Sequence, residues 1–234
     1  MWATWFGHSA VRLETGDAVI MIDPFLSGNP SFEGDVMEAA KEATHVVLTH
    51  GHDDHIGDTV EICKATGAQL VANFEICMYL GTKGIENFSP GNHGGRIDCG
   101  AFDVAFVQAW HSSSSIIDGV PQYLGNPAGV VIHPKAAKHP VVLHMGDTDI
   151  FSDMKLINEV HKPSIGFVPI GDRFTMGADL AAKACKDYFD FETVVPVHYG
   201  TFPIIDQDAS KFEAAMEGSD TSVVVPVIGA PFQL

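Results

Sequence analysis

The sequence predicts an α/β fold in which two mixed β-sheets pack face to face with helices on the outside. Strands joined by short turns come first, and strands then alternate with helices. Several strand segments are continuous apolar runs, which is typical of sheets that are covered on both faces. The length of 234 residues fits one large domain or two small ones, and no linker, repeat or change of composition marks a boundary.

The N-terminal part predicts strands in meander order. Alternating apolar residues and a Gly16-Asp17 turn predict strands at Trp2–Phe6, Ala10–Thr15 and Ala18–Ile22. The pattern then changes. A short apolar run predicts a buried strand over Thr44–Thr49, and helical spacing predicts a helix over Ile56–Thr66.

Strands and helices alternate through the rest of the chain. Further strands are expected at Gln69–Asn73, Phe102–Ala109, Ala128–Ile132, Pro140–Met145, Ile165–Ile170, Thr193–Val197 and Ser222–Val227. Helices are expected at Phe74–Leu80, Ser152–Val160, Gly177–Tyr188 and Asp206–Met216. Ser152 is a candidate N-cap because its hydroxyl can accept from a free backbone N–H of the first turn.

The charge balance argues against a nucleic-acid partner. The chain carries 13 basic and 30 acidic residues, for a formal net charge of -17. A protein that binds DNA or RNA usually presents a basic face that displaces counterions, and no basic cluster is visible here. A small anion can still bind locally where a site holds metal cations. The expected partner is therefore a small molecule.

Cysteine usage and the N-terminus favour the cytoplasm. The four cysteines show no CxxC spacing, and most lie among apolar residues, which is typical of buried reduced thiols. The first residues lack the basic and apolar regions of a signal peptide. No apolar run reaches about 18 residues, so no membrane span is expected.

The segment Thr49–Asp58 is the most informative in the chain. It follows a predicted buried strand and concentrates His50, His52, Asp54 and His55 within six positions. Burying so many histidine and aspartate side chains without partners would cost free energy, because each would lose its hydration. A metal cation offsets this cost, because imidazole and carboxylate bind divalent ions well. A strand-to-helix turn lets His50 and His52 bind one ion while Asp54 and His55 bind another.

Other metal-ligand types follow later strands. His111 follows the strand that starts at Phe102, Asp147 follows Pro140–Met145, and His198 follows Thr193–Val197. Side chains at the ends of several strands are a common way to build a site on a rigid sheet.

In this order, the residues resemble those of the metallo-β-lactamase superfamily. The pattern is His50-x-His52-x-Asp54-His55, followed by His111, Asp147 and His198, with an early Asp23 in Ile22-Asp23-Pro24. The wider motifs are similar to a group of metal-dependent hydrolases related more distantly to ascorbate-6-phosphate lactonase and N-acylphosphatidylethanolamine phospholipase D. These motifs are Phe6-Gly7-His8-Ser9, Trp110-His111-Ser112-Ser113, Gly146-Asp147-Thr148 and His198-Tyr199-Gly200-Thr201-Phe202-Pro203.

The resemblance implies the metallo-β-lactamase fold, a four-layer αββα sandwich that forms a single domain over residues 1–234. It implies a first metal held by His50, His52 and His111, and a second held by Asp54, His55 and His198. Asp147 would bridge the two ions, and Asp23 would orient a ligand or its loop. Two divalent ions are expected as cofactors, with zinc first and manganese, iron or nickel as alternatives. Relatives commonly form homo-oligomers.

The expected activity is hydrolysis of a small ester, lactone or phosphodiester by a metal-activated hydroxide, with no nucleophilic side chain. No cysteine lies in any motif, unlike the second site of many β-lactamases, and His52 stands where flavo-di-iron oxidoreductases usually carry Glu. The alternatives are a di-iron oxidoreductase and a non-catalytic metal-binding or sensor protein. The ligand carboxylates are Asp54 and Asp147, so two divalent ions leave the site cationic, which favours an anionic substrate.

Several polar residues have two interpretations. His8 is either a core histidine paired with a carbonyl or, with Asp54, a catalytic group near the metals. His144 has the same alternatives, and Arg173 either meets an anionic substrate or forms a surface ion pair. The run Ser112–Ser115 is expected to be a loop at the mouth of the site, because no Gly-x-Ser-x-Gly context suggests a serine nucleophile.

Overall fold

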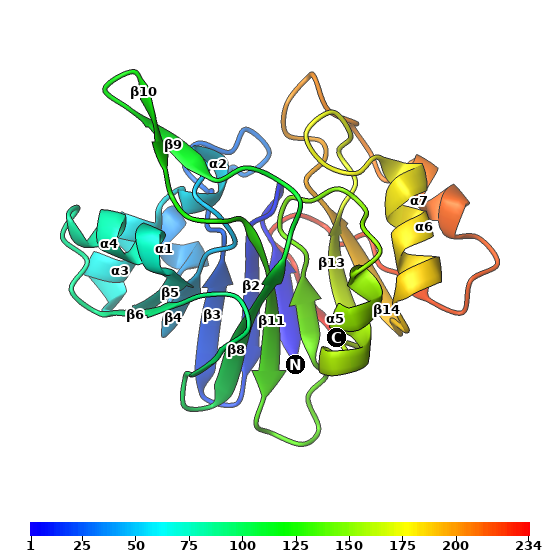
Figure 1. The fold of residues 1–234 in the computed structure, drawn as a ribbon, viewed down its shortest axis with the longest axis horizontal. Helices are drawn as coiled ribbons and strands as arrows, with labels where there is room; N and C mark the ends of the chain where they lie inside the picture. Colours follow the sequence, from blue (N-terminus) through cyan, green and yellow to red (C-terminus); the bar gives the residue numbers. More distant parts are fainter.

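Two seven-stranded sheets face each other in the computed structural model of the protein, which describes residues 1–234 (Figure 1). The first sheet holds most of the N-terminal strands and also takes in the last strand of the chain. Its order is β16 (Pro231–Gln233), β1 (Trp2–Trp5), β2 (Val11–Thr15), β3 (Ala18–Ile22), β4 (His45–Val47), β5 (Gln69–Asn73) and β6 (Phe88–Gly91).

The second sheet is built from the later strands. Its order is β15 (Ser222–Val223), β14 (Thr193–Val197), β13 (Ile165–Pro169), β12 (Val142–His144), β11 (Ala128–Pro134), β8 (Phe102–Gln108) and β7 (Arg96–Asp98). Strands β12 to β15 pair in parallel, whereas β7, β8, β11 and β12 pair antiparallel. Both sheets are therefore mixed, as the sequence predicts.

Helices cover the outer sides of the two sheets (Figure 1). Beside the first sheet lie α1 (Val36–Ala39), α3 (Thr59–Thr66) and α4 (Phe74–Gly81), with the short α2 (Asp53–Ile56) at its edge. Beside the second lie α5 (Met154–His161), α6 (Ala178–Tyr188) and α7 (Ser210–Met216). The predicted αββα sandwich is confirmed. None of these helices has both the length and the apolar character needed to cross a bilayer.

Apolar side chains from both sheets meet in one core. A cluster of 42 buried residues combines β1 and β2 of the first sheet with β8, β11 and β13 of the second. A second cluster of 19 residues lies between the first sheet and its helices. Strands that are covered on both faces in this way need apolar residues at successive positions, which accounts for the continuous apolar runs.

The structure differs from the sequence-based expectations at several elements. The expected helix Ile56–Thr66 is broken, because Gly57 has a φ of 43° and α3 starts only at Thr59. A side chain at Gly57 would meet the Pro24 carbonyl oxygen at 2.4 Å, so only glycine fits this turn. Ser152 does not cap α5, which is preceded by Asp153.

The largest difference concerns the expected loop Ser112–Ser115. The chain there enters a β-hairpin, formed by β9 (Ser114–Ile117) and β10 (Val120–Tyr123), that projects from the body of the protein (Figure 1). Its side chains are largely exposed, so they lack the burial pattern that marks strands in a sequence. Strands β6, β7 and β16 and helix α1 were also not predicted, and each is only three or four residues long.

Strand direction explains why the chemically reactive residues meet. Strands β8 and β12 each pair antiparallel with β11, and β14 runs parallel to β12 through β13. The C-terminal ends of β8, β12 and β14 therefore lie at the same edge of the second sheet. In the first sheet, β3 and β4 are parallel and end together. The residues that follow these strands form the candidate site.

Candidate metal centre

The seven residues predicted to bind metal come together at this edge and, with His8 as an eighth residue, form two adjoining groups. The first group is His50, His52, His111 and Asp147, and the second is His8, Asp54, His55 and His198. Within each group, the candidate ligand atoms all lie within 4.8 Å of one another. The structure thus joins four loops from both sheets and adds His8, from the turn between β1 and β2.

The first group surrounds His50, which is fully buried. Its Nε2 atom lies 3.0 Å from Nδ1 of His52. Asp147 Oδ2 lies 3.5 Å from His111 Nε2 and 4.0 Å from His50 Nε2. These nitrogens and the carboxylate oxygen therefore point toward a common space.

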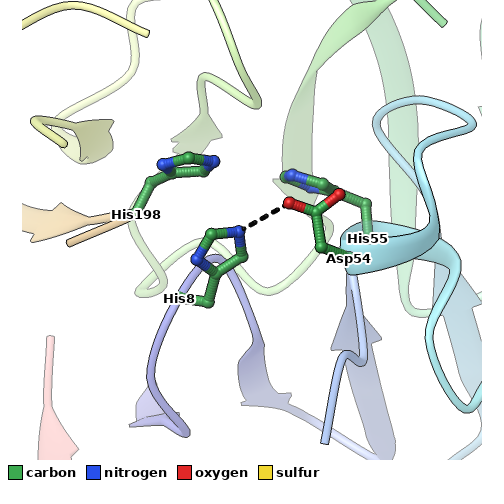
Figure 2. A group of neighbouring side chains, drawn as sticks. All are labelled: His8, Asp54, His55 and His198. Carbon is green, nitrogen blue, oxygen red and sulfur yellow. Dashed lines mark hydrogen bonds and ion pairs between the residues drawn. The ribbon is translucent and has the colours of Figure 1, made fainter. Parts of the chain in front are cut away.

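The second group lies on the other side of the Asp147 carboxylate. Its Oδ2 atom is 3.0 Å from His198 Nε2, and its Oδ1 atom is 3.3 Å from His55 Nε2. Figure 2 shows His198 and His55 on either side of a space toward which Asp54 and His8 also point. Asp147 thus contacts histidines of both groups, which is the position expected of a bridging ligand.

Several buried polar atoms here have no hydrogen-bond partner. His55 Nε2, His198 Nε2 and Asp147 Oδ1 are among the few such atoms in the protein. Buried polar atoms are almost always satisfied, so unpaired nitrogens that face a carboxylate oxygen need another partner. A divalent cation supplies it, since neutral imidazole and carboxylate are ordinary ligands of zinc and similar metals. The residues present therefore fit a metal centre.

Asp23 supports histidines of both groups. Its Oδ2 atom accepts a hydrogen bond from Nδ1 of His55 at 2.7 Å and another from the Thr49 hydroxyl at 2.6 Å. Because the Thr49 hydroxyl donates to Asp23, it accepts from Nδ1 of His50, 3.0 Å away. These contacts place a proton on Nδ1 of each ring, so that each Nε2 is the nitrogen that can bind a metal once it carries no proton.

His8 is fully buried and contacts the second group directly. Its Nε2 atom lies 3.1 Å from Asp54 Oδ2, the interaction drawn in Figure 2, and its Nδ1 atom lies 3.1 Å from Thr201 Oγ1. Its ring centroid is 4.0 Å from that of His198. The ring is therefore enclosed by the residues around the second group.

Three site residues have left-handed backbone conformations that side chains other than glycine rarely adopt. The φ angles are 50° for His8, 45° for Asp23 and 59° for His198. Each such backbone conformation destabilises the folded state by about 1–3 kcal/mol. It persists only where surrounding contacts hold it, often at functional sites. Their coincidence at one edge of the fold is an independent sign of function.

Burial keeps the histidines of the first group neutral in the metal-free protein. Desolvation lowers the pKa of His50 well below its usual value and also lowers the pKa of His52 and His111. A neutral imidazole is the form that binds metal. Desolvation, followed by the nearby His198, likewise lowers the pKa of His8 to about 4.

The second group contains a coupled pair. Desolvation lowers the pKa of His55, but the carboxylates of Asp147 and Asp23 outweigh it and raise the pKa well above its usual value. Desolvation raises the pKa of Asp147, and His198 and His55 outweigh it, so that this pKa falls well below its usual value. For Asp54, desolvation raises the pKa, but the hydrogen bond from His8 and the nearby His55 together outweigh it and lower the pKa. Without metal, the carboxylates are charged and His55 is protonated.

A cavity of about 470 Å³ opens onto the site. It is lined by Phe25, His52, Asp53, Asp54, Ser114 and Ile116. The hairpin forms one wall and is held by hydrogen bonds from Ser115 Oγ to Asp53 Oδ1 at 2.5 Å and from Gly51 N to Ser113 Oγ at 3.0 Å. The largest cavity, about 870 Å³, lies along β8 and α5 and includes His111 as its single predicted ligand.

His144 and Arg173, the other two residues with open roles, have different surroundings. His144 Nε2 donates to the Ser9 carbonyl at 3.0 Å, and its Nδ1 accepts from Gly146 N at 3.1 Å, so it joins the turns that carry His8 and Asp147. The Arg173 guanidinium lies 5.6 Å from the Phe174 ring and forms no ion pair with a carboxylate.

Two contributors were not assigned a role from the sequence. Thr49 and Thr201 each hold a histidine through a hydroxyl. Thr49 precedes His50 and Thr201 belongs to the His198 motif, so their positions indicated a place near the site. Threonine hydroxyls commonly bond to nearby backbone groups, however, so a role in holding a histidine could not be assigned from sequence alone.

Comparison with known proteins identifies the family. The model of the beta-lactamase superfamily domain matches residues 3–198. A protein of Methylocella silvestris named UPF0173 metal-dependent hydrolase is 62% identical over 225 residues, covering 96% of each chain. A Chelativorans protein of the same name is 58% identical and covers 99% of each chain.

Solved structures of similar fold support the same family. Igni18, described as a metallo hydrolase from Ignicoccus hospitalis, is 33% identical with a TM-score of 0.87, covering 100% of this chain and 98% of its own. An isothiocyanate hydrolase from Delia radicum gut bacteria has a TM-score of 0.78 at 17% identity, covering 100% and 99%, and shows the fold alone. The chain therefore belongs to the metallo-β-lactamase superfamily, in the UPF0173 family of metal-dependent hydrolases.

Proposed function

We propose that the protein is a dinuclear hydrolase that binds two divalent ions and cleaves a small ester, lactone or phosphodiester. His50, His52 and His111 would hold the first ion, Asp54, His55 and His198 would hold the second, and Asp147 would be shared by both. Zinc is the first choice of metal, with manganese, iron and nickel as alternatives that accept the same ligands.

The observation that carries this proposal is the position of the Asp147 carboxylate. Its oxygens lie 3.0 Å from His198 Nε2, 3.3 Å from His55 Nε2 and 3.5 Å from His111 Nε2. Two of these contacts lack the geometry of a hydrogen bond, since His55 Nε2 and His198 Nε2 have no hydrogen-bond partner. A carboxylate that faces the unpaired imidazole nitrogens of the second group and the imidazoles of His50 and His111 in the first is well suited to bridge two ions.

The bound ions would supply acidified water near neutral pH and would polarise a carbonyl or phosphoryl oxygen. The protein supplies position. Asp54 lines the cavity, and its side chain is 33% exposed, so its carboxylate can accept a hydrogen bond from an attacking water and orient it. The hydrogen bond from His8 keeps Asp54 ionised for this role. No serine nucleophile is required.

The cavity supports a small substrate. Its volume of about 470 Å³ lies within the usual range of about 300–1,000 Å³ for small-molecule sites. Phe25 and Ile116 offer apolar contact, while Ser114 offers a hydroxyl.

The charge of the centre supports an anionic substrate. Two divalent ions bring four positive charges against the ligand carboxylates Asp54 and Asp147, and Asp23 adds one more negative charge behind them. These groups together keep one net positive charge, whereas the chain as a whole carries a net charge of -17. A small anion that enters the cavity meets mainly the local cations.

A direct test removes and restores the metal. Treatment with a chelator should abolish hydrolysis of bis-p-nitrophenyl phosphate and of small lactones, and added zinc or manganese should restore it. Turnover that requires oxygen and iron would favour an oxidoreductase instead. Two tightly bound ions without turnover of any ester, lactone or phosphodiester would favour a non-catalytic metal-binding protein.

A further inference from the structure

His8 lies in the turn after β1, which ends at the same edge of the first sheet as β3 and β4, and it connects this turn to the second ligand group. We propose that His8 is a positioning residue. Its side chain fixes the Asp54 carboxylate and its carbonyl fixes the backbone of His198, so that both can bind the second ion. The inference rests on the proposed function, because it requires that a second ion binds.

The side chain is held at both nitrogens. Nε2 lies 3.1 Å from Asp54 Oδ2 and donates its proton to the carboxylate, while Nδ1 accepts from the Thr201 hydroxyl at 3.1 Å. The ring is fully buried, and the edge-on rings of Phe25 and Phe202 pack around it, with centroids 5.7 Å and 5.4 Å away. It has little freedom to turn, and neither does the carboxylate that it holds.

The backbone of His8 holds a second ligand at the same time. Its carbonyl oxygen accepts from His198 N at 2.8 Å and from Trp5 Nε1 at 2.9 Å. The turn is closed by the bond from Phe6 N to Ala10 O at 2.9 Å. With a φ of 50°, His8 directs its side chain to Asp54 and its carbonyl to His198. The strained conformation thus serves two ligands from different sheets.

Direct metal binding by His8 is the main rival. His55 Nε2 and His198 Nε2 are buried without a hydrogen-bond partner, as expected of atoms directed at an ion. Both nitrogens of His8 instead meet oxygen partners, the Asp54 carboxylate and the Thr201 hydroxyl. The Nε2 atom of His50, by comparison, meets another candidate ligand nitrogen, Nδ1 of His52. A role as proton donor to the substrate is the second rival, but His8 has no exposed surface and does not line the cavity beside Asp54. These contrasts favour positioning.

The test compares His8→Ala with His8→Gln, because glutamine keeps an N–H donor near the place of Nε2. The readouts are the affinity of each ion by calorimetry and the visible absorption spectrum after loading with cobalt. In His8→Ala, the second ion should bind about 10- to 100-fold more weakly while the first is unchanged. In His8→Gln, the second ion should bind within about threefold of wild type, with an unchanged cobalt spectrum.

Thr201→Val gives an independent check that leaves His8 in place. It removes the hydroxyl beside Nδ1, so the second ion should bind more weakly, with the first unchanged. Thermal unfolding of the metal-free variants separates a loss of fold from a loss of ligand position. Asp17→Asn serves as the control, because Asp17 is exposed in the turn between β2 and β3. This variant should leave the affinities for both ions unchanged.

Each contrary outcome has a separate meaning. An equal loss of affinity in His8→Gln and His8→Ala, with a changed cobalt spectrum in both, would show that His8 binds the metal itself. Unchanged second-ion affinity in a folded His8→Ala protein would also overturn the positioning role. A wild-type protein that binds one ion would instead contradict the proposed dinuclear function and, with it, this inference.

Discussion

His55 Nδ1 donates to Oδ2 of Asp23 across 2.7 Å, and both side chains are fully buried. The same oxygen accepts from the Thr49 hydroxyl, which in turn holds Nδ1 of His50. One carboxylate therefore directs a histidine of each ligand group, and its other oxygen holds the Thr49 backbone at 2.8 Å. The two ligand groups therefore share this supporting carboxylate, and Asp147 contacts histidines of both.

The first prediction concerns this shared support. Asp23→Asn keeps the shape of the side chain but removes its charge and one acceptor, so His55 and Thr49 cannot both be held as before. We expect both ions to bind about 10- to 100-fold more weakly, because such supporting contacts commonly carry this much affinity. Calorimetric titration with zinc measures this. Asp17→Asn should behave as wild type, and a folded Asp23→Asn protein with both affinities intact would refute the shared role.

The second prediction concerns Gly171, which packs against His198. A side chain at Gly171 would come within 2.0 Å of the His198 carbonyl oxygen, although the backbone there is not left-handed. Gly171→Ala should therefore destabilise the protein by about 1–3 kcal/mol, the usual cost of overpacking, and should weaken the second ion.

Denaturant unfolding of the metal-free protein measures the first effect. Gly95→Ala is the matched control, because its nearest neighbour is the Asn92 carbonyl oxygen at 3.8 Å. Equal midpoints for the two variants would show that the structure can relax around His198 without cost.

Much of the fold could be predicted because its central strands are continuous apolar runs. Strands such as Gln69–Asn73 and Thr193–Val197 have the bounds that the sequence indicates. The hairpin of Ser114–Ile117 and Val120–Tyr123 could not be predicted in this way. Its strands are exposed, and it is held through Ser113 and Ser115 by long-range contacts that no local pattern records.

The candidate ligands could be predicted because histidine and aspartate are costly to bury without a partner, so their concentration after strands is informative. The resemblance gave Asp23 a supporting role, but the particular contacts that orient the ligands could not be predicted. Thr201 meets His8 from 193 positions away, and Asp23 meets His55 from 32 positions away. Only the fold brings these partners together, and each residue type is common elsewhere in the chain.

The third prediction concerns pH. In the metal-free protein, the carboxylates of Asp147 and Asp23 outweigh desolvation and raise the pKa of His55, whereas burial lowers the pKa of His50 and His111. His55 is thus protonated near neutral pH and must release a proton when the second ion binds. The histidines of the first site are already neutral.

Affinity for the second ion should therefore rise about tenfold per pH unit below the raised pKa of His55, whereas affinity for the first should change little. Calorimetry at about pH 6 and about pH 8, in buffers with different heats of ionisation, counts the released protons. Equal pH dependence for both ions would contradict the assignment of His55 to a separate second site.

The fourth prediction concerns substrate charge. A small phosphodiester or a sugar-phosphate lactone should be hydrolysed with a higher kcat/KM than a neutral lactone, because the metal centre is cationic. A short RNA should be a poor substrate, since its charge interacts with the whole acidic surface. A neutral lactone far ahead of both anionic substrates, or rapid cleavage of RNA, would show that charge does not select the substrate.

The central claim is that two ions share Asp147, and counting the metal ions in reconstituted variants tests it most directly. Wild type should hold about two divalent ions per chain, because the donors exceed what one tetrahedral ion can use. Asp54→Ala and His198→Ala should each hold about one, and Asp147→Ala should bind both ions weakly. A single tight ion in wild type, unaffected by Asp54→Ala or His198→Ala, would contradict the account.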